Sequence, residues 1–330
     1  MQPHELGRER FGRMFKTALG PAIGRFLDDE DVVEVMLNPD GALWVEHHRT
    51  GMEETGLTLD QTDADRIVRL VAHHMKLEVD ADRPFIEADL PETGERFTGV
   101  LPPLVLRPGF SIRRHGSRLF SLADYVRDDI MTEDQAAILR AAVHTRLNIL
   151  VVGGTGSGKT TLVNALLLVV AETGDRVVLI EDRRELRCAA RNLFPMLTRP
   201  GAVELRALVR LAKGLRPDRI VLSEARGPEA LDLIKAWGSG HPGGIGTLHA
   251  DDAPLGLLAL EQMIQEAVVT VPRGLIGRVI DLIAVIAGRG TARRLVSLHH
   301  LRGLKPDGSY DLRPVSNLAD LPTGELHATA

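Results

Sequence analysis

Four glycines, a lysine and a threonine stand at a spacing that suits the binding of a polyphosphate. The segment "GGTGSGKTT" begins at Gly153, follows the apolar run "NILVV" and precedes the helical pattern "LVNALLLVVAE". Glycines let consecutive N–H groups point to one place, where the N-terminus of the following helix adds its partial positive charge. In this pattern the lysine reaches the β- and γ-phosphates of ATP, and the threonine hydroxyl ligates Mg²⁺. The predicted nucleotide-binding residues are Gly154, Thr155, Gly156, Ser157, Gly158, Lys159, Thr160 and Thr161.

Two later apolar runs end in acidic residues that can act on the bound phosphates. "VVLIED" delivers Glu181 and Asp182, and "IVLSE" delivers Glu224. The carboxyl ends of parallel strands lie at one edge of a sheet, where such acids can hold Mg²⁺ or orient an attacking water. Exposed acids at strand ends are the alternative interpretation. We predict Thr160 and Glu224 as metal ligands, and Glu181, Glu224 and Lys159 as catalytic residues.

Two histidines, His241 and His249, stand in the segment "GSGHPGGIGTLHADD". Their separation matches no familiar zinc spacing, and no cysteine pair completes a metal site. The run "GIGTLHA" is a further apolar strand, so His249 reaches the edge where the acids lie and can donate to the γ-phosphate. A structural histidine is the alternative. We predict a segment that senses the phosphate, with His249 as a catalytic residue and His241 as a nucleotide-binding residue.

The composition of the 330 residues is that of a soluble folded protein, with 44% hydrophobic and 26% charged residues. The net charge of −5 gives no general reason to bind nucleic acid, and no sequence-specific binding is expected. The single cysteine, Cys188, excludes an internal disulfide framework and suits a reducing cytosol. Neither a secretory signal nor a membrane-spanning apolar stretch is found. We therefore expect a cytoplasmic protein that partners bring to a membrane.

The order of the expected elements predicts an α/β protein in two parts. Short strand-like runs such as "VVEVMLN", "ALWVEHH" and "GFSIRR" surround a helical pattern at 60–76 in the first part. In the second part, apolar strands alternate with helices, which indicates a mainly parallel sheet, and Thr132 and Gln135 form a capping box at its first helix. The predicted divisions are a mixed α+β domain at 1–114, a linker at 115–130, a nucleotide-binding domain at 131–304 and a flexible tail at 305–330.

Four motifs in this order resemble those of the type II/IV secretion ATPase superfamily. "GGTGSGKTT", "LIEDRREL", "LRPDRIVLSEARGPEALDLIKAW" and "GHPGGIGTLHA" are similar to its Walker A, Asp-box, Walker B and His-box motifs. The resemblance covers residues 80–304. Phrases such as "ERFTGVLPP" and "GRFLDDEDVVEVMLNPDGALWVE" are most similar to the conjugal-transfer branch of type IV secretion, the TrbB ATPases.

The resemblance implies an Mg²⁺-dependent ATPase that forms a homohexameric ring. Its N-terminal domain and its RecA-like P-loop domain hold ATP between them, and hydrolysis energises pilus assembly or substrate transfer at the inner membrane, with membrane components of the secretion machine as partners. The implied roles are Walker A for Lys159 and Thr160, Walker B for Glu224, Asp box for Glu181, and His box for His241 and His249. Arg113 or Arg114 is implied to reach the γ-phosphate from the N-terminal side, with Arg113 predicted as catalytic, Arg114 as nucleotide-binding and Arg96 as a weaker candidate.

The chain departs from the family pattern at four positions. They are Arg183, Gly214, Ser223 and Ala259, where Thr, Arg, Gly and Arg are usual. Two cations expected near the subunit boundary are thus missing, so we expect slow hydrolysis by the isolated protein. The alternatives are a type II secretion or type IV pilus ATPase, and a nucleotide-gated structural subunit that hydrolyses little ATP.

Overall fold

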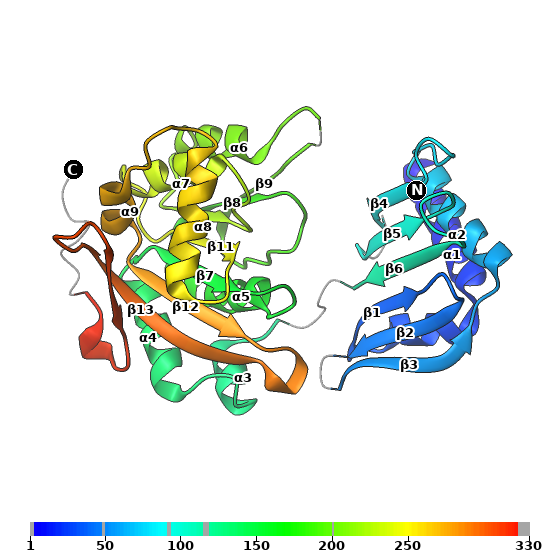
Figure 1. Ribbon diagram of the computed structural model, residues 1–330, viewed down its shortest axis with the longest axis horizontal. Helices are drawn as coiled ribbons and strands as arrows, with labels where there is room; N and C mark the ends of the chain where they lie inside the picture. Colours follow the sequence, from blue (N-terminus) through cyan, green and yellow to red (C-terminus); the bar gives the residue numbers. More distant parts are fainter. Residues whose placement is uncertain (1–2, 48–49, 91–93, 115–118, 200, 323–330) are drawn as a thin grey trace. The chain divides into compact units, whose positions relative to one another are not determined.

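Two separate sheets organise the protein, one in each of the two units into which the chain divides, at residues 1–118 and 119–330 (Figure 1). The computed structural model describes residues 3–47, 50–90, 94–114, 119–199 and 201–322.

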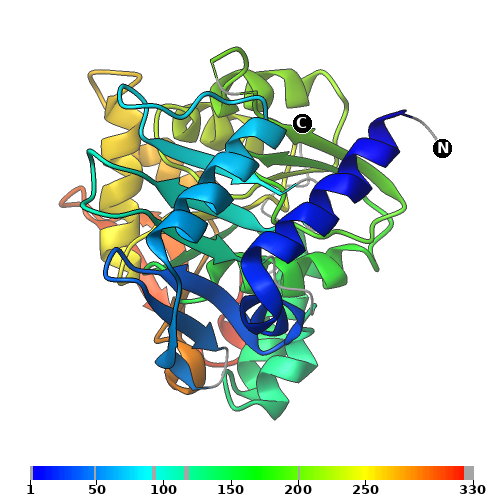
Figure 2. The ribbon, with the colours of Figure 1, turned by 90° about the vertical axis from the view of Figure 1, so that its right-hand side faces the viewer.

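The first unit is built on an antiparallel sheet of six strands in the order β3-β2-β1-β6-β5-β4. Its helices α1 and α2 lie side by side on one face of that sheet (Figure 2). The elements are α1 (Pro3–Asp28), β1 (Val32–Leu37), β2 (Ala42–His47), β3 (Gly51–Thr58), α2 (Gln61–His74), β4 (Phe85–Asp89), β5 (Arg96–Val100) and β6 (Gly109–Arg113). The prediction of a mixed α and β domain at the N-terminus is confirmed.

Local side-chain contacts explain where these elements turn and begin. Between β1 and β2 the Asp40 carboxylate accepts the N–H of Ala42 at 2.9 Å, and Gly41 adopts a φ of 91° that L side chains rarely adopt. At the start of α2, the Asp60 carboxylate accepts the N–H of Thr62 at 2.8 Å and so caps the helix.

Helix α1 was not predicted from the sequence, although its core-facing side chains repeat every four residues. Phe11, Phe15, Leu19 and Ile23 are buried against the first sheet and α2. The pattern is interrupted at Gly20, which has a φ of 74° and precedes Pro21. Two helical segments meet at this kink, and the break hides the periodicity in a short window.

The second unit is built on an eight-stranded sheet in the order β14-β13-β12-β7-β11-β10-β8-β9. The six strands from β12 to β9 are parallel, while β13 and β14 are antiparallel to their neighbours. Its elements are α3 (Leu122–Arg127), α4 (Glu133–His144), β7 (Ile149–Gly153), α5 (Lys159–Val170), β8 (Arg176–Glu181), β9 (Asn192–Leu197), α6 (Leu205–Lys213), β10 (Arg219–Leu222), α7 (Glu229–Trp237), β11 (Ile245–His249), α8 (Ala253–Gln265), α9 (Arg273–Val279), β12 (Leu282–Ala287), η1 (Gly290–Ala292), β13 (Arg294–Leu304), β14 (Tyr310–Pro314) and η2 (Leu318–Asp320). The mainly parallel sheet of the prediction is confirmed.

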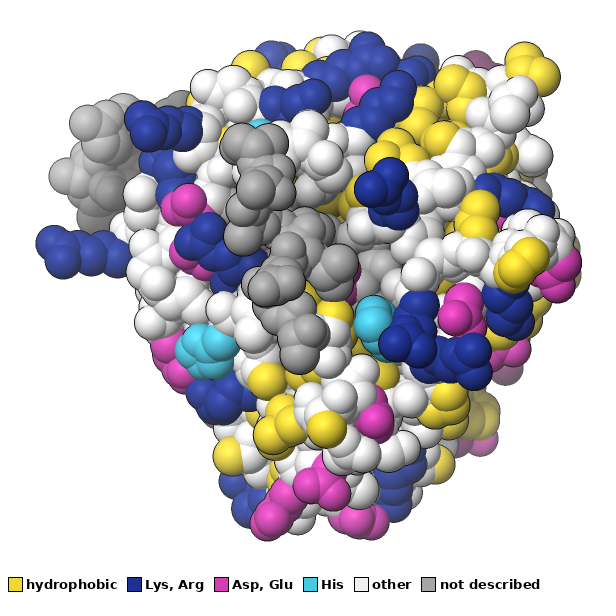
Figure 3. Space-filling model, turned by 90° about the vertical axis from the view of Figure 1, so that its left-hand side faces the viewer, with side chains coloured by type: hydrophobic (Ala, Val, Ile, Leu, Met, Phe, Trp, Pro, Cys, Tyr) yellow, Lys and Arg dark blue, Asp and Glu magenta, His cyan; other side chains and the backbone are white. Residues whose placement is uncertain are grey.

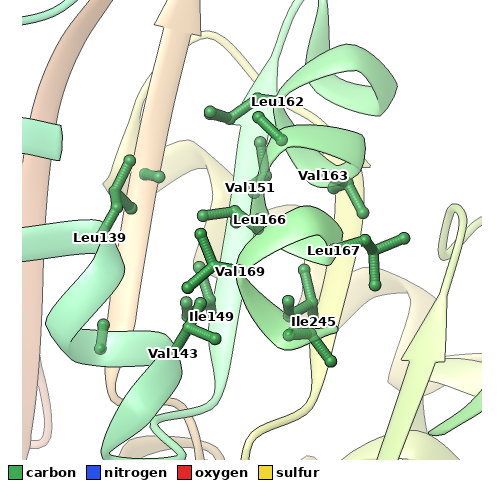
Figure 4. Packing of buried hydrophobic residues seen from close by; sticks show 14 of the residues in the cluster. Leu139, Val143, Ile149, Val151, Leu162, Val163, Leu166, Leu167, Val169 and Ile245 are labelled. Atoms are coloured by element: carbon green, nitrogen blue, oxygen red, sulfur yellow. The ribbon is translucent and has the colours of Figure 1, made fainter. Parts of the chain in front are cut away.

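Helices cover both faces of this sheet because its central strands are apolar on both sides. Ile149 and Val151 of β7 face the cluster formed with α4 and α5, whereas Leu150 and Val152 face the cluster formed with α6 to α9. Figure 4 shows the first cluster, in which α5 places its apolar side chains against β7 and β11. The predicted capping box at the start of α4 is present, with Thr132 and Gln135 bonded to each other's backbone N–H groups.

Two predicted boundaries differ from the structure of the second unit. Residues 119–130, expected in the linker, include α3, whose Leu122 and Tyr125 are buried in the core of this unit. Part of the expected tail, at 310–314, forms β14 and pairs with β13, since Tyr310 and Leu312 pack on the core and the Tyr310 hydroxyl donates to Glu261 at 2.7 Å. The linker residues 115–118 and the tail residues 323–330 lie outside the described residues.

Across the part of the chain that the structure describes, no helix has both the length and the apolar character of a membrane span. On the face shown in Figure 3, basic, acidic and hydrophobic side chains interleave, and no one kind covers the surface.

Replacing Gly244 by Ala should destabilise the second unit by about 2 kcal/mol, because a Cβ there would lie 2.0 Å from Nε1 of the buried Trp237. Gly274→Ala is the matched control, since Gly274 is in α9 and nothing lies within 4 Å of its added Cβ. That control should gain up to about 1 kcal/mol. Urea unfolding followed by circular dichroism measures both, and equal stability of Gly244→Ala and the wild type would contradict the tight packing.

Candidate nucleotide site

The predicted phosphate-binding segment joins β7 to α5 as a tight glycine-rich loop. Gly156 and Gly158 have φ values of 76° and 97°, and Gly158 is the residue before α5. The loop also packs closely on its own unit, because a Cβ on Gly153 would lie 2.3 Å from the carbonyl oxygen of Ile286 in β12. These close approaches and positive φ values explain why the segment is rich in glycine.

Lys159 folds back into this loop. Its Nζ donates to the carbonyl oxygens of Gly153 at 2.9 Å and Gly154 at 3.1 Å, and the residue is only 7% exposed. The side of the loop on which this ammonium group lies is called its inner side. The ammonium group is held there by hydrogen bonds that an anionic phosphate can replace.

The parallel register brings His249 and Glu224 to Lys159. His249 ends β11 opposite Gly153, the last residue of β7, and Glu224 follows β10. The Lys159 Nζ lies 3.1 Å from Nδ1 of His249, and Nε2 of His249 lies 2.9 Å from Oε1 of Glu224. The structure thus brings together three of the predicted catalytic residues.

His249 is neutral in this arrangement. Burial and the neighbouring Lys159 charge lower the pKa of His249, and the Glu224 carboxylate opposes this shift. Because an ammonium group can only donate, Nδ1 accepts from Lys159, and the proton assigned to Nε2 is donated to Glu224. The histidine therefore connects the lysine to the acid with a defined direction of hydrogen bonding.

Arg226 extends this network and was not predicted. One end of its guanidinium lies 2.8 Å from Oε2 of Glu224, and the other lies 2.8 Å from Oδ2 of Asp182. Arg226 stands two positions after Glu224, so a basic residue close behind the strand-end acid was the available signal. It fixes the second oxygen of Glu224 while the first faces His249.

Glu181 bonds to the segment that follows β8. It is 3% exposed, and its Oε1 accepts the backbone N–H groups of Glu185 at 2.8 Å and Leu186 at 2.7 Å. Glu185 in turn accepts a hydrogen bond from the hydroxyl of Thr160 at 3.3 Å. Glu181 therefore shapes the segment that carries Glu185, and Glu185 is a residue of this edge that the sequence analysis missed.

His241 lies at the opposite edge of the sheet. It precedes β11, and its Nδ1 lies 2.9 Å from the carbonyl oxygen of Pro217, which precedes β10. β11 begins after His241 and ends at His249, so the strand, about 13 Å long for four steps of ~3.3 Å, places the two histidines at its opposite ends. Within this unit, His241 is therefore not placed with the predicted nucleotide-binding residues.

The predicted arginines of the first unit differ in their surroundings. Arg113 is exposed at the end of β6, in register with Arg96 of β5 and Glu34 of β1. Arg114 is partly buried, and its Nη1 donates to the carbonyl oxygens of Asp29 and, at 3.3 Å, Val32. Arg114 thus holds the start of β1, whereas the side chain of Arg113 projects into solvent.

Two further arginines, Arg289 and Arg293, contact the phosphate loop from the hairpin between β12 and β13. They lie against the loop at Gly156 and Gly158. Neither arginine was predicted to belong to the site, since nothing in a linear sequence shows which loop a hairpin approaches.

The site can bind a polyphosphate and supply a base beside it. Across the described residues, no group of three or more His, Cys, Asp or Glu side chains could hold a metal ion by itself. The donors present are the Thr160 hydroxyl and acidic oxygens, a set that suits a hard cation whose remaining ligands come from phosphate and water.

The amino-acid sequence matches secretion proteins along most of its length. The profile of the family "Type II/IV secretion system protein" matches residues 25–298. The conjugal transfer protein TrbB of Rhizobium radiobacter is 43% identical over 90% of this chain and 92% of its own length. The type IV secretion system protein PtlH of Bordetella pertussis is 35% identical over 86% and 94%. The ATPase DotB of Yersinia pseudotuberculosis has a similar fold, with a TM-score of 0.58, 15% identity and coverage of 89% and 76%.

Glu181→Gln should remove a pH-dependent cost to stability. Burial raises the pKa of Glu181 above 4.5, so its charged form disfavours folding as the pH rises through the folded-state pKa. The Gln oxygen still accepts both N–H groups, so the variant's free energy of unfolding relative to wild type should increase from about pH 5 to about pH 8. Urea titrations at the two pH values measure this, with the exposed Glu172→Gln as control. If the free energy of unfolding of the variant relative to wild type instead decreased toward pH 8, the prediction would be wrong. The two N–H groups would then stabilise the Glu181 carboxylate by more than burial destabilises it.

Proposed function

Because the chain belongs to the family of type II/IV secretion system proteins, we propose that it is the Mg²⁺-dependent ATPase of a conjugative type IV secretion system. It hydrolyses ATP to ADP and phosphate, and the energy drives pilus assembly or substrate transfer at the inner membrane.

The observation that carries this proposal is the chain of contacts from Lys159 through His249 to Glu224 at the mouth of the phosphate loop. A lysine that binds phosphate and an acid that orients water are two of the groups that phosphoryl transfer to water uses in P-loop proteins. The histidine between them is in contact with both. It can therefore respond to the phosphate that the lysine binds and alter the position of the acid.

In the proposed reaction, Lys159 leaves the carbonyl oxygens of Gly153 and Gly154 and binds the β- and γ-phosphates. Glu224 accepts a proton from water as the water oxygen bonds to the γ-phosphorus. The bond between that phosphorus and the bridging oxygen breaks, and ADP leaves with the electron pair. His249 and Arg226 hold the two oxygens of Glu224 in position. Thr160 and Glu224 supply oxygen donors for Mg²⁺, which neutralises phosphate charge when bound.

Arg113 of the N-terminal domain is proposed to reach the γ-phosphate, since its exposed guanidinium suits bidentate binding of phosphate oxygens. Arg114 serves its own domain instead, because its side chain is bonded to Asp29 and Val32. We further propose the division into an N-terminal domain and a motor domain, the assembly of a homohexameric ring in the cytoplasm, and recruitment by inner-membrane components of the secretion machine.

Lys159→Ala and Glu224→Gln should each reduce steady-state ATP turnover by about 100-fold or more. Glu224→Gln should keep ATP binding, because it leaves the loop and Lys159 intact, and removal of Mg²⁺ by chelation should abolish wild-type turnover. Turnover by the purified full chain, measured over a concentration range that spans assembly, tests this with Glu172→Gln as control. Tight ATP binding without turnover above that of Lys159→Ala would refute the ATPase proposal and favour a nucleotide-gated structural subunit.

Arg113→Ala and Arg114→Ala should distinguish a role in ATP hydrolysis from a role in the stability of the first unit. Loss of Arg113 should lower turnover by about tenfold or more while the midpoint of urea unfolding stays unchanged. Loss of Arg114 should instead lower the stability of the first unit by about 1 kcal/mol, because carbonyl oxygens lose their donor. Equal turnover of Arg113→Ala and wild type would exclude this arginine from the reaction.

A further inference from the structure

The outer side of the phosphate loop is held by two arginines from one hairpin. Arg289 follows β12, and its Nε donates to the carbonyl oxygen of Thr155 at 3.1 Å. Arg293 precedes β13, and its Nη2 donates to the carbonyl oxygen of Gly156 at 3.4 Å. The two arginines therefore contact consecutive carbonyl groups of the loop.

The direction of a carbonyl group fixes the direction of the N–H group in the same peptide unit. The unit is planar and trans, so its C=O and N–H point to opposite sides. The Thr155 carbonyl shares its unit with the Gly156 N–H, and the Gly156 carbonyl shares its unit with the Ser157 N–H. Holding both carbonyls on the hairpin side turns both N–H groups to the other side.

The other side is the inside of the loop. The Ser157 N–H donates to the Gly154 carbonyl oxygen at 3.3 Å, and the same oxygen accepts from Lys159 Nζ at 3.1 Å. In the peptide unit between Gly156 and Ser157, the carbonyl group therefore faces Arg293 on the outside of the loop. The N–H group faces the inside, where Lys159 lies.

The glycines of the loop make room for these guanidinium groups. A Cβ on Gly156 would lie 3.2 Å from Nε of Arg289, and a Cβ on Gly158 would lie 2.9 Å from Nε of Arg293. The Nε of Arg293 is also buried without a hydrogen-bond partner among the described residues. A buried donor without a partner costs free energy, so its retention calls for a structural or functional reason.

We propose that Arg289 and Arg293 are positioning residues that hold the Gly156 and Ser157 N–H groups toward the β-phosphate before the nucleotide binds. Each guanidinium also polarises the peptide unit that it contacts and adds positive charge behind the loop. The inference rests on the proposed function, since it concerns how the same loop binds ATP. The hairpin of β12 and β13 thereby becomes part of the nucleotide site.

The test is a titration of the full-length chain with ATP and with ADP, using fluorescent analogues of both. Arg289→Ala and Arg293→Ala should each lower the binding affinity for both nucleotides by about tenfold. The loss should be similar for ATP and ADP, because both carry the β-phosphate. The KM for ATP should rise in parallel while kcat changes less than about threefold. Arg289→Lys, which keeps a charge and a donor, should recover affinity to within about threefold of wild type.

Arg294→Ala is the matched control, because Arg294 lies in the same hairpin and bonds to Thr291 and Arg293 carbonyl oxygens rather than to the loop. Urea unfolding of each variant identifies any loss of folding, and the exposed Arg289 provides the test if Arg293→Ala does not fold. Wild-type nucleotide affinity in the variant that carries both Arg289→Ala and Arg293→Ala would overturn the inference while the proposed function stands. A loss of affinity for ATP alone would have the same consequence. Failure of the wild-type chain to bind either nucleotide would instead overturn the proposed function, and the inference with it.

Discussion

The site depends on one ladder of backbone hydrogen bonds, the parallel pairing of β7 with β11. This register sets His249 opposite Gly153 and so places the histidine beside Lys159 at the start of α5. A slip by one residue would turn the His249 side chain to the other face of the sheet. The strands resist such a slip because both of their faces are buried under helices. The packing of the core therefore fixes the geometry of the polar groups at its edge.

Charge at this edge is arranged in a sequence of alternating donors and acceptors. Lys159 donates to neutral His249, His249 donates to Glu224, and Arg226 joins Glu224 to Asp182. Both carboxylate oxygens of Glu224 have a partner, so this acid is not held as an isolated charge. A displacement of the Lys159 side chain can therefore affect the position of Asp182 through these hydrogen bonds and ion pairs.

The sequence was sufficient for features that follow from topology and insufficient for those that follow from tertiary packing. The parallel strands and the meeting of Lys159, Glu224 and His249 were predictable, because the carboxyl ends of parallel strands share one edge. The same reasoning, applied more strictly, separates His241 from His249, since His241 precedes β11 and His249 is its last residue. The role of Glu181 toward backbone N–H groups and the approach of Arg289 were not predictable, because both depend on how a loop or hairpin folds over the edge.

The shape of the phosphate loop is set from two directions before any ligand binds. Lys159 holds two carbonyl groups on the inside, and Arg289 with Arg293 hold the next two on the outside. In the binding mode that we propose, a nucleotide would replace only the inner contacts, because the outer carbonyls lie on the far side of their peptide units. Under this proposal the loop is largely ordered during folding rather than during binding, which would lower the entropic cost of capturing the phosphates. Glycine is needed at 156 and 158 both for the positive φ and for the space that the arginines occupy.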